Sequence, residues 1–163
     1  MTGKLVSLED LCREAEKLRA RGLRLAATSG CFDILHAGHV AYLEEARAKA
    51  DALAVMLNSD ASVRGLKGPE RPVVPEGDRA AVLAGLSCVD WICLFGDPTP
   101  CGCYGAFRPD IIVKGGDYRG KHIPEEEASA AWGGRVEYVD FVEGRSTTRI
   151  IEKIKLLVKD GNM

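Results

Sequence analysis

The chain reads TSGCFDILHAGH from Thr28 to His39. An apolar run that begins at Leu23 leads into this stretch and predicts a buried strand, and the apolar residues after it recur at helical spacing. Gly30 marks the turn between the two elements, and Gly38 stands where the helix begins. The order strand, glycine turn, helix is the repeating unit of parallel α/β sheets. The stretch therefore predicts an α/β fold.

Short apolar strands alternate with amphipathic helices along the rest of the chain. Further strands are predicted at residues 52–57, 91–95, 110–113 and 136–141. Helices are predicted at residues 7–21, 38–50, 79–86 and 125–132, and from about residue 146. Residues 64–78 are rich in Gly, Pro and charge, and predict a long functional loop. The alternation predicts one Rossmann-like, doubly wound parallel sheet of about five strands with helices on both faces.

Composition bounds the class of protein. The 163 residues, 46% hydrophobic and 28% charged, suit a single domain, with a helical N-terminal extension at residues 7–21 and a core at 23–158. A net charge of -2 argues against a broad basic surface for nucleic acid or anionic lipid. The sequence lacks a signal-like or membrane-spanning apolar run, so we expect a cytoplasmic protein with no membrane or nucleic-acid partner. The six cysteines lack the spacing of a zinc site and are expected to be reduced.

Two imidazoles, His36 and His39, stand three residues apart where a helix is predicted to begin. Both can face one phosphate, because helix starts offer free backbone N–H groups to anions and Gly38 lets the chain pass close to a ligand. Imidazole N–H groups can also stabilise the charge that grows on a transferring phosphoryl group. The alternative is a pair of capping or surface histidines, which the neighbouring glycine, phenylalanine and aspartate of residues 30–33 disfavour.

Ser146, Thr147 and Thr148 form a second segment that suits phosphates. Hydroxyls combined with free N–H groups at a helix start can hold the β- and γ-phosphates of a nucleotide. The alternative is a plain N-cap, because Ser and Thr are preferred there for stability alone. The histidine motif earlier in the chain favours phosphate binding.

Basic side chains in and after the predicted loop are candidates for the same phosphates. Lys67 can approach as a point charge when the loop closes. Arg71 and Arg79 either bind substrate or make surface ion pairs. The sequence leaves both interpretations open for the two arginines.

Polar residues that follow the predicted strands complete the candidate site. The sequence KGGDY at residues 114–118 follows a strand, so backbone near Gly115 could approach the nucleotide and Asp117 could bind a ribose hydroxyl. A plain glycine turn is the alternative. Asp33 is placed to orient sugar hydroxyls or to help hold Mg²⁺, which we expect mainly on the nucleotide phosphates. Asn58 is either a polar contact or a helix cap.

These motifs resemble those of the D-glycero-β-D-manno-heptose 1-phosphate adenylyltransferases, which belong to the H-x-G-H nucleotidyltransferase superfamily. The similarity runs from about the first predicted helix to the last. In many bacteria this activity is the C-terminal half of a bifunctional protein with a sugar kinase half, and the present length matches a stand-alone adenylyltransferase. The resemblance implies transfer of AMP from ATP to a sugar 1-phosphate, with release of pyrophosphate and formation of ADP-heptose for the lipopolysaccharide core. It further implies Mg²⁺ with ATP, and a homodimer.

The motifs and the resemblance together give a full set of site residues. The expected catalytic residues are His36, His39 and Lys67. The expected nucleotide-binding residues are Ser29, Gly30, Cys31, Phe32, Gly38, Asn58, Lys114, Gly115, Asp117, Tyr118, Ser146, Thr147 and Thr148. The expected substrate-binding residues are Asp33, Arg71 and Arg79, and no protein metal ligand is expected.

Two alternatives remain. A cytidylyltransferase of glycerol 3-phosphate or a similar alcohol phosphate shares both main motifs, but that group carries an arginine five residues before the serine of Ser-Thr-Thr, where this chain has Phe141. A non-catalytic nucleotide-binding module usually loses charged site residues, and here each motif position is filled. Fold alone does not separate these functions.

Overall fold

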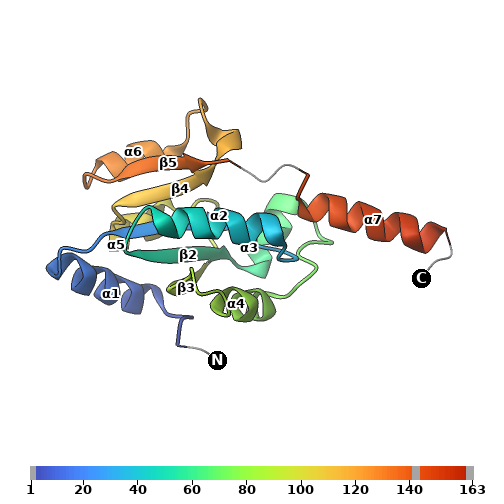
Figure 1. The fold of residues 1–163 in the computed structure, drawn as a ribbon, viewed down its shortest axis with the longest axis horizontal. Helices are drawn as coiled ribbons and strands as arrows, with labels where there is room; N and C mark the ends of the chain where they lie inside the picture. Colours follow the sequence, from blue (N-terminus) through green and yellow to red (C-terminus); the bar gives the residue numbers. More distant parts are fainter. Residues whose placement is uncertain (1–2, 141–143, 161–163) are drawn as a thin grey trace.

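Five parallel strands form the central sheet (Figure 1). The structure is a computed structural model and describes residues 3–140 and 144–160. In spatial order the strands are β3 (Trp91–Phe95), β2 (Ala52–Asn58), β1 (Leu25–Gly30), β4 (Ile111–Gly115) and β5 (Arg135–Val139). After β3 the chain crosses to the other side of β1, so the strand order reverses between β1 and β4. Ligands of open parallel sheets bind beyond the carboxyl ends of strands at such a point.

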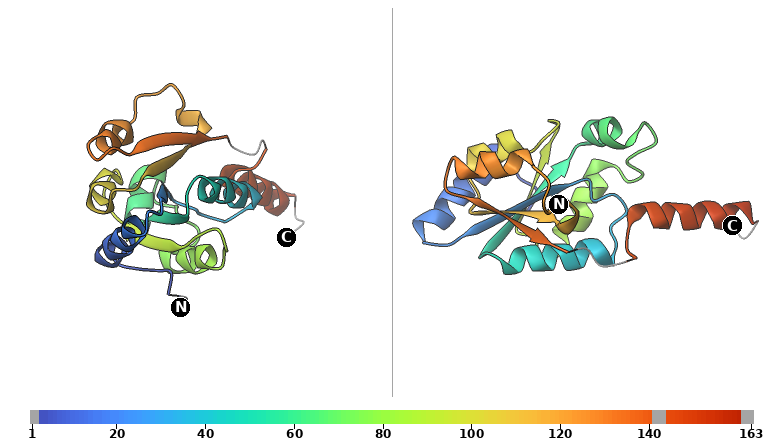
Figure 2. Two further views of the ribbon diagram at one scale, coloured as in Figure 1. Left: turned by 60° about the vertical axis from the view of Figure 1, so that its left-hand side comes forward. Right: turned by 90° about the horizontal axis from the view of Figure 1, so that it is seen from above.

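Helices cover both faces of the sheet, as predicted. They are α1 (Leu8–Ala20), α2 (Ala37–Ala48), α3 (Asp60–Lys67), α4 (Glu76–Ala84), α5 (Cys101–Phe107), α6 (Pro124–Ala130) and α7 (Thr147–Lys159), with a 3₁₀ turn at Gly116–Tyr118. In the left view of Figure 2, α1, α5 and α6 lie along one face and α2 and α4 along the other. The predicted Rossmann-like α/β class is therefore confirmed.

The buried residues of β2 show why this sheet needs two helical layers. All seven residues of the strand are buried. Leu53, Val55 and Leu57 join the core cluster of α2 and α4, whereas the alternate residues Ala54 and Met56 join the cluster of α1 and α5. Successive side chains of a strand point to opposite faces, so an uninterrupted apolar run buries both faces at once.

A polar contact holds α2 against the switch point. The hydroxyl of Tyr42 lies 2.7 Å from Oγ1 of Thr28 in β1 and donates to the carbonyl of Val113 in β4 at 2.9 Å. All three residues are buried. The middle of α2 is thereby held against β1 and β4.

The prediction of a long loop at residues 64–78 is wrong in its bounds, because the loop is shorter. Helix α3 continues to Lys67 and α4 begins at Glu76, which leaves residues 68–75 between them. Ser59 caps α3 by accepting the N–H of Ser62, so the alternative that Asn58 is the cap is also wrong. Only Val63 of α3 is buried, and a helix with so short an apolar face gives little periodicity in the sequence.

Helix α5 was not predicted. Its seven residues include two glycines, which disfavour helix formation. Burial of Cys103, Tyr104 and Phe107 in the core cluster shared with α1 stabilises it instead. All six cysteines of the chain are free thiols.

Helix α7 extends away from the rest of the molecule (Figures 1 and 2). Ser146 caps it by accepting the N–H of Arg149 at 3.2 Å. No residue of Thr147–Lys159 is buried, and Leu156 is 61% exposed. Within the described part of the chain, none of the helices has the length and apolar content to span a bilayer.

Candidate active site

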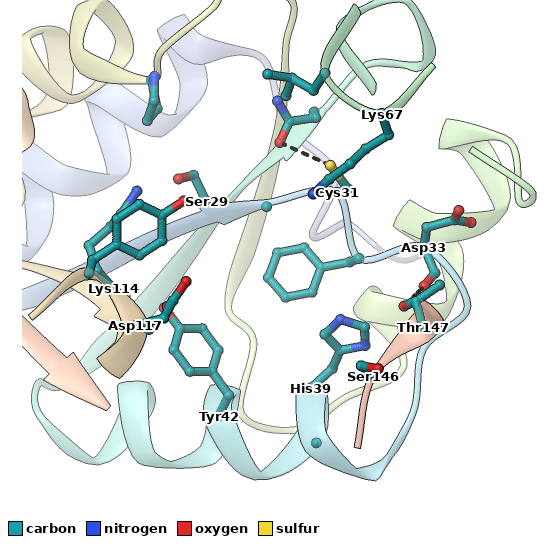
Figure 3. A pocket seen from close by; sticks show the side chains of 18 of the residues that line it. Ser29, Cys31, Asp33, His39, Tyr42, Lys67, Lys114, Asp117, Ser146 and Thr147 are labelled. Atoms are coloured by element: carbon teal, nitrogen blue, oxygen red, sulfur yellow. Dashed lines mark hydrogen bonds between the residues drawn. The ribbon is translucent and has the colours of Figure 1, made fainter. Parts of the chain in front are cut away.

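A cavity of about 880 Å³ opens at the carboxyl ends of β1, β2 and β4 (Figure 3). It gathers nearly all the residues expected from the sequence, although they lie up to 119 positions apart, from Ser29 to Thr148. The lining includes Ser29, Gly30, Cys31, Phe32, Asp33, His36, Gly38, His39, Asn58, Lys67, Arg71, Lys114, Gly115, Asp117, Tyr118, Ser146, Thr147 and Thr148. Of the expected set, only Arg79 lies outside this lining.

The two histidines cap α2 and face the cavity at the same time. Their rings stack with centroids 3.9 Å apart at an interplanar angle of 23°. Nδ1 of His36 accepts the N–H of Gly38 at 3.1 Å, and Nδ1 of His39 accepts the N–H of His36 at 3.4 Å. A neutral imidazole that accepts at Nδ1 carries its proton on Nε2. The capping bonds thus leave an Nε2–H donor on each ring.

Both imidazoles are held neutral. Burial, and then the neighbouring His36, lower the pKa of His39 to about 4, against the opposing charge of Asp33. Burial, and then the charge of Arg145, lower the pKa of His36 as well. A neutral imidazole still has one N–H group, which can donate a hydrogen bond to a phosphate oxygen.

Gly38 is required by a close approach of two segments. A Cβ atom at this position would lie 2.9 Å from Cβ of Arg145 and 3.0 Å from Cε1 of His36. Arg145 lines the cavity next to the histidines and was not among the expected site residues. Its position directly before Ser146 was the signal that could have identified it.

Asp33 anchors the loop between α3 and α4. Its carboxylate accepts Nε–H of Arg71 at 2.7 Å and the backbone N–H groups of Val73 and Val74 at 2.9 and 3.0 Å, and its side chain is 1% exposed. Burial alone would raise the pKa of Asp33, but the two backbone donors and the Arg71 guanidinium outweigh burial and lower this pKa. We therefore correct the expected role of Asp33, because its carboxylate is committed to the protein rather than to sugar hydroxyls or Mg²⁺.

The turn around Asp33 is strained. Phe32 and Ile34, which flank it, have φ values of 45° and 53°. Residues other than glycine rarely adopt this left-handed backbone conformation, so contacts with the surrounding structure have to stabilise it. Thr147 contributes by donating from Oγ1 to the carbonyl of Asp33 at 2.7 Å, which also ties the start of α7 to the turn.

Arg79 is a structural residue, which corrects the expectation that it binds substrate. Its side chain is 1% exposed. The guanidinium donates to the carbonyl of Val74 at 2.9 Å, to the carbonyl of Cys31 at 2.5 Å and to Oδ1 of Asp60 at 2.7 Å. Arg79 therefore joins the turn after β1, the loop and the start of α3.

Cationic side chains surround the histidine end of the cavity. Lys67 is the exposed last residue of α3, and Arg71 lies 19% exposed in the following loop. The ion pair of Arg71 with Asp33 uses Nε, so it does not consume the Nη groups. Together with Arg145 from the other side, these residues make this end of the cavity suited to polyphosphate.

The opposite end of the cavity holds a paired charge. Nζ of Lys114 lies 2.7 Å from Oε1 of Glu125, and the two side chains are 12% and 5% exposed. Nζ of Lys114 also lies 4.8 Å from the ring centroid of Tyr118. No local pattern marked Glu125 as a site residue, because its partner Lys114 is eleven positions earlier and on a different element.

Comparison with known proteins agrees with this arrangement. Residues 27–153 match the cytidylyltransferase-like family. The chain is a member of this family of nucleotidyltransferases. The predicted nucleotidyltransferase is thus confirmed at the level of the family.

This nucleotidyltransferase is about half identical in sequence to several curated relatives. It is 49% identical over 152 residues to the bifunctional protein HldE of Geotalea uraniireducens, and covers 31% of that protein with 93% of its own length. It is 52% identical over 141 residues to the bifunctional protein HldE of Pelobacter propionicus, and covers 28% of that protein with 86% of its own length. The chain thus spans about a third of the length of these relatives.

A solved structure shares the fold. The lipopolysaccharide core biosynthesis protein from Thermoplasma volcanium GSS1 is 28% identical, with a TM-score of 0.62 over 76% of this chain and 100% of that chain. Phe141, the residue expected to separate this nucleotidyltransferase from the glycerol 3-phosphate cytidylyltransferases, lies outside the described residues.

Proposed function

We propose that this nucleotidyltransferase transfers AMP from ATP to D-glycero-β-D-manno-heptose 1-phosphate, giving ADP-heptose and pyrophosphate. The observation that carries the proposal is the neutral pair His36 and His39, which presents two N–H donors in a cavity ringed by Lys67, Arg71 and Arg145. The relatives named HldE and the lipopolysaccharide core protein support the choice of sugar. We further propose that the reaction takes place in the cytoplasm, where ATP is available.

The reaction is an in-line displacement at the α-phosphorus of ATP. A phosphate oxygen of the sugar 1-phosphate forms the new bond, and the bond from the α-phosphorus to the oxygen that bridges to the β-phosphate breaks. Nε2–H of His36 and of His39 donate to the α-phosphate oxygens as negative charge grows on them. No side chain acts as a nucleophile, so positioning and electrostatics supply the catalysis.

The departing pyrophosphate is held at the start of α7. Ser146 uses its hydroxyl to cap the helix and Thr147 uses its hydroxyl on the turn, so their backbone N–H groups and the hydroxyl of Thr148 are the candidate phosphate donors. Lys67 neutralises charge from the α3 side of the cavity, and Arg145 does so from the α7 side. Charge that spreads onto the leaving group thus meets cations on two sides.

We propose that Mg²⁺ arrives on the phosphates of ATP. Mg²⁺ is usually held by substrate phosphates, waters and one or two carboxylates. The Asp33 carboxylate in the turn is already bonded to Arg71, Val73 and Val74. Within the described part of the chain, no group of three His, Cys, Asp or Glu side chains is arranged to hold a metal ion.

We propose a homodimer in which a second copy covers the apolar face of α7. Ile154 is 44% exposed and Val158 is 55% exposed, although α7 has 13 residues and an isolated helix of this length is marginal in water. The helix extends away from its own sheet, and two-fold homodimers are the commonest assemblies (Figure 2). Analytical ultracentrifugation should find a dimer for the parent and a monomer for Ile154→Glu. A monomeric parent contradicts the proposal.

Pyrophosphate release tests the proposed function directly. ATP, CTP, GTP and UTP are each combined with heptose 1-phosphate, mannose 1-phosphate and glycerol 3-phosphate. The pair of ATP and heptose 1-phosphate should give the highest kcat/KM. Faster turnover with CTP and glycerol 3-phosphate would instead establish the cytidylyltransferase alternative, and no turnover with any pair would establish a non-catalytic nucleotide-binding module.

A further inference from the structure

We propose that Lys114, Glu125 and Ser29 form a subsite that binds the ring hydroxyls of the acceptor sugar. This inference rests on the proposed function, and it changes the expected role of Lys114 and Ser29 from nucleotide to acceptor. The subsite lies at the carboxyl ends of β1 and β4 and the start of α6. Glu125 is the new member of the site.

The charge of this end of the cavity separates it from the phosphate end. The ammonium of Lys114 is neutralised by the Glu125 carboxylate at 2.7 Å, with both groups largely removed from water. A paired lysine attracts phosphate far less than a free one, because the carboxylate beside it repels the anion. At the histidine end, by contrast, Lys67 and Arg145 line the cavity as cations without a carboxylate bonded to them in the described residues.

The paired charges fit hydroxyl groups. An ammonium has three N–H donors and a carboxylate has about four acceptor positions, so one mutual bond between Lys114 and Glu125 leaves capacity on both. A sugar hydroxyl both donates and accepts, and can bond to the two groups together. Buried polar groups that lack a full set of partners discriminate strongly against ligands that cannot supply them.

In-line geometry places the acceptor at this end. The attacking and leaving oxygens stand on opposite sides of the α-phosphorus. In Figure 3, His39 lies between Ser146 and Thr147 on one side and Ser29 and Lys114 on the other. With the pyrophosphate at the start of α7, the acceptor oxygen approaches from the Ser29 and Lys114 side.

A buried hydroxyl next to Ser29 adds to the polar character of this end. Tyr104 is 0% exposed, and its hydroxyl makes no hydrogen bond of normal geometry with any described residue. Burial raises the pKa of Tyr104 well above its ordinary value, although the Ser29 side chain nearby opposes this. Ser29 lines the cavity at the end of β1, so its hydroxyl can join Tyr104 to a ligand.

The test compares Glu125→Gln with Glu127→Gln, a matched change two positions away on α6 at an exposed side chain outside the cavity. Calorimetry measures binding of heptose 1-phosphate, inorganic phosphate and ATP, the first two also with the unreactive analogue α,β-methylene ATP present. Glu125→Gln should weaken heptose 1-phosphate binding by about tenfold or more, toward the affinity for inorganic phosphate, with ATP binding unchanged. Glu127→Gln should match the parent.

A second variant keeps the test decisive if Glu125→Gln does not fold. Lys114→Met combined with Glu125→Leu removes both charges and keeps apolar volume, a change that buried ion pairs often tolerate. It should lose heptose 1-phosphate binding and retain ATP binding. Sugar phosphate affinity equal to that of the parent in either variant, or an equal loss for ATP, overturns the subsite.

The binding assay also separates this inference from the proposed function. If ATP and heptose 1-phosphate give no pyrophosphate, while Glu125→Gln still selectively loses sugar phosphate, the function fails and the subsite stands. If the parent turns over and the KM of Glu125→Gln for heptose 1-phosphate is unchanged, the function stands and the subsite fails.

Discussion

The buried carboxylate of Asp33 accepts Nε–H of Arg71 at 2.7 Å, and this bond ties the strained turn after β1 to the loop between α3 and α4. Backbone N–H groups of Val73 and Val74 donate to the same carboxylate. The loop that carries Arg71 is thus held in place before any substrate binds.

Asp33→Ala should destabilise the protein by about 3 kcal/mol, because it removes one partner of a buried, hydrogen-bonded ion pair. Urea denaturation monitored by circular dichroism measures the change. Asp97→Ala, at an exposed position, should cost less than about 0.5 kcal/mol. Equal effects of the two substitutions would mean that the Asp33 contacts add nothing to stability.

The ion pair of Asp33 with Arg71 also predicts how the stability of the protein depends on pH. The pKa of Asp33 is lowered in the folded protein, so its contribution is complete above the ordinary pKa of 3.8 and is lost as pH falls through the lower folded value. Denaturation midpoints between pH 7 and pH 3 should therefore fall more steeply at the acidic end for the parent than for Asp33→Asn. Parallel curves would contradict this.

Gly38→Ala should abolish most activity and leave the fold intact, because the new Cβ would press on the ring of His36 and on Arg145. Gly65→Ala in α3 is the control, since nothing lies within 4 Å of a Cβ there. The control should keep full activity and gain up to about 1 kcal/mol in stability. Pyrophosphate release and thermal melts on both variants check the prediction. A fully active Gly38→Ala would show that the close approach at this position is not needed for catalysis.

Lys67→Ala should lower kcat by about tenfold or more and weaken ATP binding less, because its charge is needed most as phosphate charge redistributes. Arg64→Ala removes a cation from the same helix outside the cavity lining, and should change neither quantity. Steady-state kinetics and ATP calorimetry on both variants measure the effects. An unchanged kcat in Lys67→Ala would show that Lys67 is a surface lysine without a role in catalysis.

The neutral histidines predict the pH profile. With the pKa of His39 lowered to about 4 and that of His36 lowered below its ordinary value, the neutral form of both rings predominates in the free enzyme above pH 6.5. kcat/KM should therefore show no loss as pH rises through 6.5. NMR titration of the imidazole Cε1–H signals measures the two pKa values independently. A rate that falls above pH 6.5 would show that the protonated ring is the active form.

Local sequence patterns predicted the strands and most helices because burial on both faces of the sheet requires continuous apolar runs. They did not predict α5, whose glycines disfavour a helix that long-range packing nevertheless stabilises. The same limit applies to the site. The motifs marked residues that line the cavity, but the partners of Asp33 and Arg79 lie on segments distant in sequence, so their structural roles could not be read from spacing.

Glu125 and Arg145 line the cavity but are not identified by the sequence motifs. Glu125 lies in a polar stretch whose carboxylates look alike in sequence, and only the fold selects it to pair with Lys114. Arg145 precedes a known motif, and the close approach at Gly38 places it beside His36. Both side chains acquire their positions from contacts between elements rather than from local pattern.

The role of the histidine pair is tested by comparing turnover and ATP binding in His39→Ala, with His122→Ala as the control at an exposed histidine outside the cavity. Single-turnover measurements with ATP and heptose 1-phosphate give the rate of the chemical step, and calorimetry gives the Kd for ATP. Loss of one donor that acts in the transition state should slow His39→Ala by about a hundredfold, or about 3 kcal/mol, and change Kd by less than about threefold. His122→Ala should match the parent. A folded His39→Ala that binds ATP and reacts at the parent's rate would reduce the histidine pair to a helix cap and contradict the mechanism.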